Sequence, residues 1–588
     1  MALTKVSPEI LDLNNTAGTS NLRLGVNAGN SIVSGGNYNV VVGDEAGTAI
    51  TTGDENTFVG YAAGDATTTA GNNTAVGGSA LTANTTGIDN NAFGQGALTA
   101  NTTGNNNVAM GRMAGTTNTT GANNVAIGHV ALRMNTTGAS NVAIGSQALD
   151  ANTTGESNVA VGISALSADT KGTNNVAVGR GALETQNFTS ATASLNVAVG
   201  SLAGNAVTTG VNNTIIGGLA GDAMTTASYN TAVGTNALGA NTTASYNTAV
   251  GYSALLANTT GASNVAVGLA ALDANTTGAD NTAVGTHALG ANTTASNNTA
   301  VGRDALESNT TGYSNAAIGA LALTNSTTGI FNTACGKSAL GAVTTGGGNT
   351  GLGYAALYLA TTGGNNTGLG RGAGAAVTTA SHNVLIGARG GDGVTTGGAN
   401  TLIGYESGSY GTVLTTGSVN TLVGAYNHTT AATTQGAMAL GYNLNCAAGY
   451  TTIGTGVSDI RAAHGNVTWA TVSDERYKKN IVDSEAGLSF INALQPRTFK
   501  YRTLGELPET FSAYEEGSTE VFKNSVTNHG FIAQEVKAAI DADDSIADGF
   551  KLWDDREDGS QEVAEAALIP VLVKAIQELT ARIETLEG

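Results

Sequence analysis

"NVAVGLAALDANTTGAD", residues 264–280, is one copy of a 17-residue unit that fills most of the chain. The unit reads N-[TV]-A-[VI]-G-x-x-A-L-x-A-N-T-T-G-x-x, and its first glycine recurs every 17 residues from Gly43 to Gly179 and from Gly200 to Gly404. An insertion at residues 185–195 lengthens the step between these two runs to 21 residues, and the pattern loosens after Gly404. A fixed period of this kind indicates a repeat architecture in which each unit packs on its neighbours.

Each unit combines a strand pattern with a turn pattern. The segment [TV]-A-[VI]-G alternates large and small side chains, which is typical of a strand with one aliphatic face and one small face. The segment A-N-T-T-G supplies Asn and Gly, which favour tight corners because both tolerate a left-handed backbone. Seventeen residues are too few for a βαβ unit and lack a helical apolar stripe. The sequence therefore predicts a mostly β protein, a parallel β-solenoid.

The thin coil leads to a prediction about assembly. Each unit offers only a few Val, Ile, Leu and Ala side chains, so one coil buries little apolar surface by itself. We interpret the invariant small face, Ala and Gly, as the surface on which identical chains approach each other closely. A homo-oligomer is the expected state.

Composition excludes several classes of function. The chain has 588 residues, 83 Gly, 4 Pro and a formal net charge of −20, and no basic tract gathers its 23 Lys and Arg. Nucleic-acid binding is therefore not expected. No apolar window is long enough to span a membrane. The two Cys and six His lack the spacing of a zinc site, so no metal or cofactor is predicted.

The repeat resembles a known family at "NNVAIG" (123–128) and "SNVAIG" (140–145). These motifs are similar to the head repeats of trimeric autotransporter adhesins, which form a trimeric parallel β-roll. The resemblance implies three chains and a rod that binds surfaces. The start of the sequence shows no signal peptide and its end shows no barrel strands, so attachment to a cell surface is not expected.

A domain boundary is predicted near Ser473. Charged residues rise from about 7% before it to about 30% after it, and three of the four prolines lie beyond it. We divide the chain into an attachment segment (1–20), a regular shaft (21–404), irregular repeats and a neck (405–472), and a small α+β domain (473–588).

Four segments of the last domain carry a second resemblance: "SDERYKKNI" (473–481), "QPRTFKY" (495–501), "NHGFIAQEV" (528–536) and "LIPVLVKAIQELTARIETLE" (568–587). Together they closely resemble the intramolecular chaperone at the end of phage endosialidases, tail spikes and tail fibres, a self-cleaving serine/lysine peptidase family. The resemblance implies that this domain drives trimerisation and then cuts the Val472–Ser473 bond.

Ser473 would be the nucleophile of this cleavage and Lys478 its base. A serine hydroxyl needs a base to remove its proton, and a lysine serves as one when burial or a nearby cation favours its neutral form. Lys479 and Arg476 are close enough in sequence to be such cations. An isolated S-x-x-x-x-K pattern would be better explained as an exposed charge cluster, and only the four-segment context favours the catalytic interpretation. His529 is interpreted as structural.

The final segment predicts a helix with a heptad seam, formed by Ile569, Leu572, Ile576, Leu579, Ile583 and Leu586. Such a seam favours a coiled coil between chains. Packing of the same residues within one subunit explains the pattern nearly as well, and the sequence leaves both open.

These features predict a phage tail fibre or appendage. It would be assembled in the host cytoplasm and carried on the virion, with phage tail or baseplate proteins at one end and a host-surface glycan or protein receptor as its target. The alternatives are a glycan depolymerase, for which paired carboxylates do not recur in the repeats, a bacterial surface adhesin, and an ice-binding solenoid, for which adjacent threonines have the wrong alternation.

Overall fold

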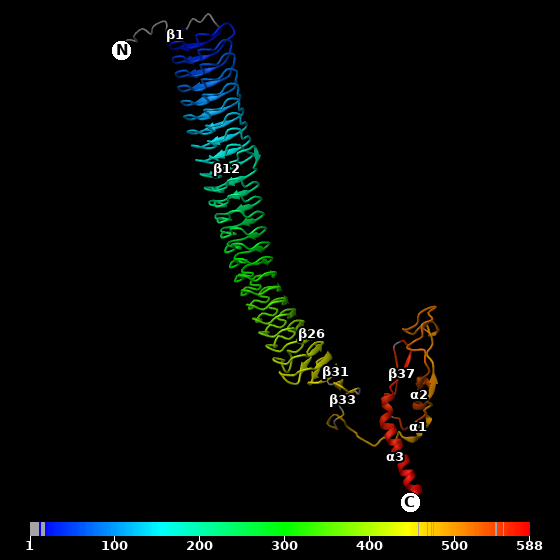
Figure 1. Cartoon of the computed structure of the whole chain (residues 1–588). Helices are drawn as coiled ribbons and strands as arrows, with labels where there is room; N and C mark the ends of the chain where they lie inside the picture. Colours follow the sequence, from blue (N-terminus) through cyan, green and yellow to red (C-terminus); the bar gives the residue numbers. More distant parts are fainter. Residues whose placement is uncertain are drawn as a thin grey trace. The chain divides into compact units, whose positions relative to one another are not determined.

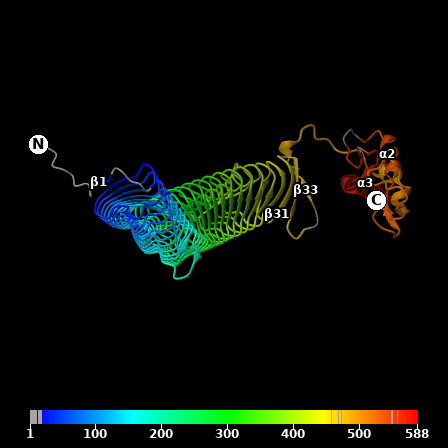
Figure 2. The ribbon, with the colours of Figure 1, turned by 90° about the horizontal axis from the view of Figure 1, so that it is seen from above.

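The computed structural model of the chain describes residues 11–12, 18–456, 458–466, 469–471, 473, 475–546, 550–556 and 558–588. The chain divides into two compact units, residues 1–472 and 473–588. The first contains the coils, which stack one on another along a shaft (Figure 1). Seen from above, the coils are flattened loops (Figure 2). The predicted fold, a mostly β parallel solenoid followed by a small α/β unit with a C-terminal helix, is confirmed.

One long parallel ladder runs through the shaft, with one strand from each coil. A strand pairs residue for residue with the strand of the next coil, as where Val265, Ala266 and Val267 pair with Thr282, Ala283 and Val284. The strands of this ladder are β2 (Leu22–Leu24), β3 (Val40–Val42), β4 (Thr57–Val59), β5 (Thr74–Val76), β6 (Asn91–Phe93), β7 (Val108–Met110), β8 (Val125–Ile127), β9 (Val142–Ile144), β10 (Val159–Val161), β12 (Val176–Val178), β14 (Val197–Val199), β15 (Thr214–Ile216), β16 (Thr231–Val233), β17 (Thr248–Val250), β18 (Val265–Val267), β19 (Thr282–Val284), β20 (Thr299–Val301), β21 (Ala316–Ile318), β22 (Thr333–Cys335), β23 (Thr350–Leu352), β24 (Thr367–Leu369), β25 (Val384–Ile386), β26 (Thr401–Ile403), β27 (Thr421–Val423), β29 (Met438–Tyr442) and β31 (Tyr450–Thr455).

Antiparallel strands cover both edges of this ladder. At one end β1 (Leu11–Asp12) pairs with β2. At the other end β32 (Ser458–Ala463) pairs with β31, and β33 (Ala470–Thr471) pairs with β32. An open strand edge invites pairing with another chain, so these strands protect the ends of the stack.

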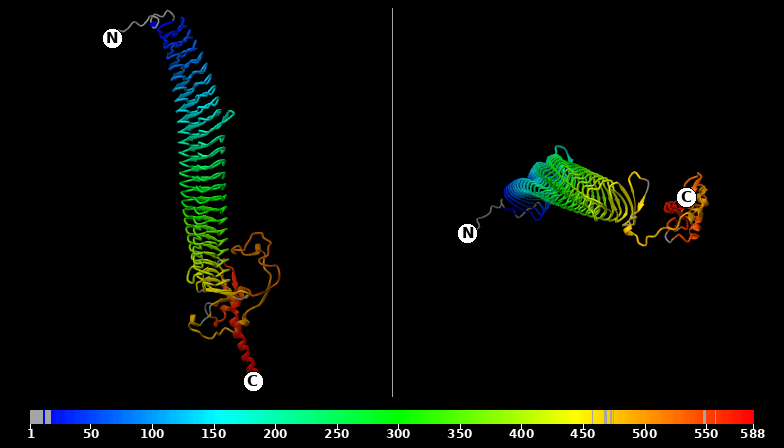
Figure 3. Two further views of the ribbon diagram at one scale, coloured as in Figure 1. Left: turned by 60° about the vertical axis from the view of Figure 1, so that its left-hand side comes forward. Right: turned by 90° about the horizontal axis from the view of Figure 1, so that it is seen from below.

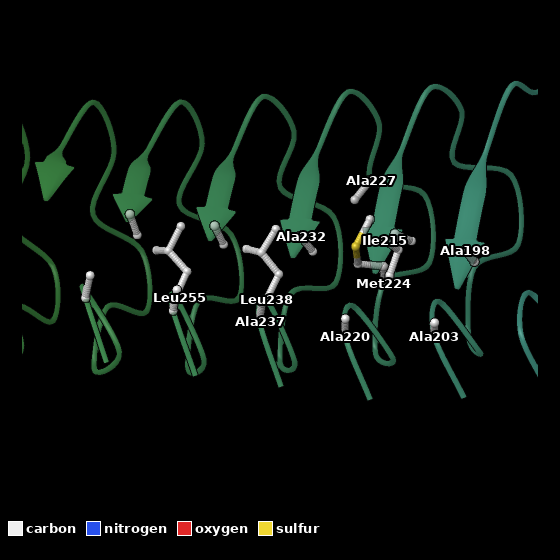
Figure 4. Close-up of a cluster of buried hydrophobic side chains, with 14 of the residues drawn as sticks. Ala198, Ala203, Ile215, Ala220, Met224, Ala227, Ala232, Ala237, Leu238 and Leu255 are labelled. Atoms are coloured by element: carbon white, nitrogen blue, oxygen red, sulfur yellow. The ribbon is translucent and has the colours of Figure 1, made fainter. Parts of the chain in front are cut away.

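The interior of the shaft corrects the prediction about the two strand faces. The middle residue of each strand, usually Ala, points into the coil and is buried, as Ala198 and Ala232 do opposite leucines such as Leu238 in Figure 4. The larger residues on either side of it point outward. The small face is therefore the core of the coil, and its assignment to contacts between chains was wrong. Ala is usual there because a leucine such as Leu238 fills the coil from the opposite side. Where the middle residue is larger, as Phe58 and Ile215 are, a glycine (Gly64 or Gly221) takes the place of that leucine.

Buried asparagines explain the first residue of the unit. The backbone N–H and the side-chain amide of Asn281 both donate to Oδ1 of Asn264 one coil earlier, at 3.0 and 3.2 Å. The same amide donates to the carbonyl oxygen of Ala295 at 2.8 Å. Because Asn281 and Asn264 are fully buried, these bonds satisfy polar groups that would otherwise cost stability.

The glycine of the unit is required by close packing of the backbone. Gly268 has a φ of 139°, and a Cβ added to it would lie 2.6 Å from the carbonyl oxygen of Gly285 in the next coil. A residue with a side chain would be strained in conformation and would push the coils apart. This accounts for the invariance of the glycine along the shaft.

The insertion at residues 185–195 interrupts the regular coils. It projects from the stack as a short loop, visible in cyan in Figure 3. Its strand β13 (Thr192–Ala193) pairs in parallel with β11 (Gly172–Thr173), and Phe188 is buried beneath it. A second small pair, β28 (His428–Thr429) and β30 (Asn445–Cys446), lies near the end of the shaft. The insertion is therefore anchored to the solenoid.

The second unit packs short strands and three α-helices around one small core. Its elements are η1 (Glu475–Tyr477), α1 (Leu488–Ala493), β34 (Arg497–Phe499), η2 (Leu504–Glu506), β35 (Asn528–Gly530), α2 (Ala533–Asp541), β36 (Trp553–Asp555), β37 (Gln561–Val563), η3 (Glu565–Ala567) and α3 (Leu568–Glu587). β34 pairs with β35 and β36 with β37, both antiparallel. The core consists of Ala486, Phe490, Leu494, Val536, Ala539, Leu552, Leu568 and Val571.

Candidate functional site

The predicted serine and lysine lie in contact at the start of the second unit. Lys478 Nζ donates a hydrogen bond to Ser473 Oγ at 2.7 Å. The turn of η1 lies between them, and the backbone N–H of Lys478 donates to the carbonyl oxygen of Glu475 at 2.9 Å. This turn brings two side chains five residues apart onto one side of the backbone, where an amine can exchange a proton with the hydroxyl.

The surroundings of this pair are open to solvent. Ser473 and Lys478 are both exposed. Burial of an amine favours its neutral, proton-accepting form, and the single chain does not supply that burial. Val472, the other side of the predicted cleavage bond, lies outside the described residues. The catalytic roles of Ser473 and Lys478 stay a prediction.

Helix α3 carries two apolar faces that do different things. Leu568, Val571 and Ala575 are buried and pack toward the core of their own unit. The heptad residues are exposed, at 41–87% of their full surface: Ile569, Leu572, Ile576, Leu579, Ile583 and Leu586. The sequence left packing within one subunit open for this seam. In the single chain the seam residues stay 41–87% exposed, and a different face of the helix packs on the core.

The position of α3 is fixed by a polar contact with α1. A carboxylate oxygen of Glu578 accepts a hydrogen bond from the backbone N–H of Leu488, at the N-terminus of α1, at 2.9 Å. Gly487, the N-cap of α1, lies so close to this carboxylate that a Cβ would clash with it. A carboxylate at a helix N-terminus satisfies a free N–H group and interacts favourably with the helix dipole. The contact holds α3 against its unit while the seam stays exposed.

The aliphatic face that the sequence predicted for each strand lies on the outer face of the shaft ladder, where it forms a second apolar surface. The residue directly before the repeat glycine is apolar in every coil from Val42 to Leu440. Its side chain points outward from the strand, and several members are more than one-third exposed: Phe93, Met110, Ile144, Ile216, Val284, Val301, Ile318, Leu352, Leu369 and Leu440. The residue directly after the glycine varies freely and includes Arg303, Lys337 and Tyr354. We call the first of these positions the apolar row.

A continuous row of this kind needs an explanation. Scattered apolar residues are normal on a protein surface, whereas a contiguous apolar strip marks a place of contact. The residue before the repeat glycine is always apolar, whereas the residue after it varies freely. Exposure to solvent alone would not keep the first position apolar. The apolar row is therefore a candidate interface.

The structure also brings together residues that the sequence did not group. His287, Asp304 and Glu307 lie on neighbouring coils, with their possible ligand atoms within 4.8 Å of one another. No metal ligands were predicted, because these residues lack the local spacing of known metal motifs. The repeat period itself was the missed signal, since His287 and Asp304 are 17 residues apart.

Comparison with known families gives one match. The model of the peptidase S74 family, described as the chaperone of endosialidase, matches residues 473–544. The match begins at Ser473 and covers the first part of the second unit, so over those residues the chain is similar to this chaperone. No curated protein matches the chain. Within the part of the chain that the structure describes, no helix is both long enough and apolar enough to span a membrane.

Proposed function

We propose that the protein is a homotrimeric phage tail fibre or appendage whose C-terminal unit assembles the shaft and then cleaves itself off before Ser473. One observation carries the proposal: three features coincide at Ser473. The boundary between the two compact units lies there, the match to the endosialidase chaperone begins there, and Ser473 contacts Lys478 there. A device that separates two parts after assembly belongs at such a junction.

The trimer is supported by two exposed apolar surfaces. The family of the matched chaperone is associated with trimerisation. The seam of α3 has heptad spacing and stays 41–87% exposed in the single chain, and the apolar row of the shaft is also partly exposed. Contact between chains would cover both surfaces. In a trimer, the seam would align three C-terminal units and the apolar rows would pack against each other.

Assembly would start at the C-terminal unit. A long parallel assembly must lose chain entropy before its contacts form, so it nucleates slowly. Three C-terminal units joined by α3 would hold the chains in register while the shaft forms. Removal of these units afterwards would leave a fibre that unfolds only over a high barrier.

The remaining parts have roles that follow from this arrangement. Residues 1–20, most of which lie outside the described residues, would join the fibre to phage tail or baseplate proteins. The shaft would carry the contact with a host-surface glycan or protein. The fibre would be assembled in the host cytoplasm and carried on the virion.

Intact-mass spectrometry of the purified chain tests the proposed cleavage. The wild-type chain should give two fragments, one ending at Val472 and one beginning at Ser473, whereas Ser473→Ala and Lys478→Met should stay at the full 58.1 kDa. Lys551→Met is the control, because it removes an exposed lysine of the same unit outside the predicted pair and should still be cleaved. A full-length mass for the wild-type chain in folded oligomers would refute self-cleavage and leave the fibre standing.

A further inference from the structure

We propose that His287, Asp304 and Glu307 form a surface site for a divalent transition-metal ion, for which Zn²⁺ is the best match. Imidazole nitrogen and carboxylate oxygen are ligands that Zn²⁺ accepts together, and three protein ligands leave a position for water. Ca²⁺ and Mg²⁺ prefer oxygen ligands alone and match this set less well.

The solenoid geometry places the three groups. His287 and Asp304 occupy the second position after the repeat glycine in consecutive coils, both with positive φ, and His287 Nδ1 lies 3.6 Å from Asp304 Oδ1. Glu307 lies three residues after Asp304, and its carboxylate is within 4.8 Å of both other groups. The imidazole is about half exposed and the Asp304 side chain is largely covered. A metal ion could therefore reach the site from solvent while one ligand is held in place.

A glycine, Gly290, and a third carboxylate, that of Asp273, lie beside the three groups. Gly290 lies between Asp273 and Glu307 in the column of residues 17 apart, so this column places no side chain between their carboxylates. A Cβ at Gly290 would lie 3.6 Å from Asp273 Oδ1. The Asp273 carboxylate is close enough to His287 for the two groups to interact electrostatically, so it adds negative charge beside the proposed site.

One contact competes with the metal. The Arg303 guanidinium lies 3.0 Å from Asp304 Oδ2, so that oxygen is already in an ion pair. Oδ1, the oxygen nearer to His287, stays available. Removal of this competing cation, as in Arg303→Thr, should strengthen metal binding.

The shaft contains a matched site that lacks the ligands. Asp222 and Gly239 repeat the geometry of Asp273 and Gly290, including the distance of 3.6 Å from an added Cβ to the carboxylate. The positions of the three proposed ligands are occupied there by Asn236, Ser253 and Leu256. Asn236 and Ser253 have the same positive φ as their counterparts. The shaft therefore accepts these residues at this position, and they supply substitutions that should fold.

The test is a titration of the untagged full-length chain with ZnCl2, measured by calorimetry. The wild-type chain should bind one Zn²⁺ per chain at this site, and His287→Asn, Asp304→Ser and Glu307→Leu should each weaken binding by about tenfold or more, the loss that even outer-shell changes cause. MgCl2 should not compete. Asp222→Asn, at the matched site, should leave binding unchanged.

A second, independent test introduces the three proposed ligands at the matched site. The triple variant Asn236→His, Ser253→Asp, Leu256→Glu should raise the stoichiometry from one to two Zn²⁺ per chain. Zn²⁺ should also raise the melting temperature of the wild-type chain, because an ion that binds only the folded coils stabilises them, and His287→Asn should abolish that shift. No binding by the wild-type chain, or binding that His287→Asn leaves unchanged, would overturn the proposal.

Discussion

The shaft repeats one 17-residue coil almost without change, whereas residues 473–588 contain no repeat and about four times the fraction of charged residues. In the shaft, nearly every coil has the same apolar residue on its outer face and the same buried asparagine that bonds the next coil of the chain. Two chains displaced by one whole coil would still match most of these features. The shaft alone therefore specifies the alignment of partner chains weakly.

The C-terminal unit has the opposite property. Each of its elements occurs once, and α3 offers a single seam of less than three heptads. Only one alignment of identical chains matches all of these features together. The comparison shows why a repetitive fibre would need a non-repetitive unit to set its register before the coils associate.

Removal of the C-terminal unit should have the largest effect. A chain that ends at Val472 would lose the proposed nucleus, so we expect aggregated or misaligned shafts and little soluble trimer. Soluble yield and light scattering compare it with the Ser473→Ala chain, which keeps the unit. Equal yields of correctly sized trimer from both chains would remove the assembly role of the unit.

Charges in the α3 seam should have the next largest effect. Ile576→Glu with Ile583→Glu replaces two seam residues, and burial of each isoleucine between chains is worth about 2 kcal/mol per chain. We expect loss of the trimer at micromolar concentration, measured by sedimentation. Gln577→Glu adds one such charge beside the seam and should leave the trimer intact, whereas Ile576→Glu alone should already weaken it. Trimers that tolerate the seam variant would assign assembly to another surface.

A charge in the apolar row of the shaft should have a smaller effect, because one coil among many is changed. Ile318→Glu should destabilise the trimeric shaft by about 2 kcal/mol per chain in denaturant unfolding. Ala320→Glu, on the other side of Gly319, is the matched control and should be close to neutral. Equal effects of the two substitutions would show that the apolar row faces solvent.

The smallest predicted effect concerns the buried asparagines at the A-N-T-T-G corner of each coil. The asparagines of the A-N-T-T-G corner also form a ladder, as where Asn275 donates to Asn258 Oδ1 at 2.9 Å. The ladder is broken at Ser326, where Asn309 Oδ1 and Ser326 Oγ are buried without a hydrogen-bond partner among the described residues. Ser326→Asn supplies a donor to Asn309 and should stabilise the shaft by about 1 kcal/mol in denaturant unfolding. A loss of stability would show that the space at this corner is too small for an amide.

The sequence predicted the solenoid because its signals are local and repeated. The period locates the coils, Asn and Gly locate the corners, and strand alternation groups the residues that share a face. Alternation does not say which face is inside. Ala266 is buried and Val267 is half-buried because Leu272 already fills the interior of this coil from the opposite side, a consequence of three-dimensional packing that alternation alone does not reveal.

Local motifs in the sequence also predicted part of the candidate site, whereas contacts between residues far apart in the sequence were missed. The motif named Ser473 and Lys478, and the structure adds the 2.7 Å contact between them. The heptad spacing of α3 fitted two explanations nearly equally well, and only the burial of Val571 and Ala575 shows that the core uses a different face of the helix. The cluster at His287 was missed because its members meet across the 17-residue period instead of within a short motif.

The most direct test of the central claim is the molar mass of the Ser473→Ala chain in solution, measured by light scattering during gel filtration. This variant keeps both units on one chain, so the result depends on assembly and not on cleavage. We predict a mass three times 58.1 kDa that is unchanged on dilution through the micromolar range. A folded species at 58.1 kDa would contradict the account, because both apolar surfaces would then face water in the native protein.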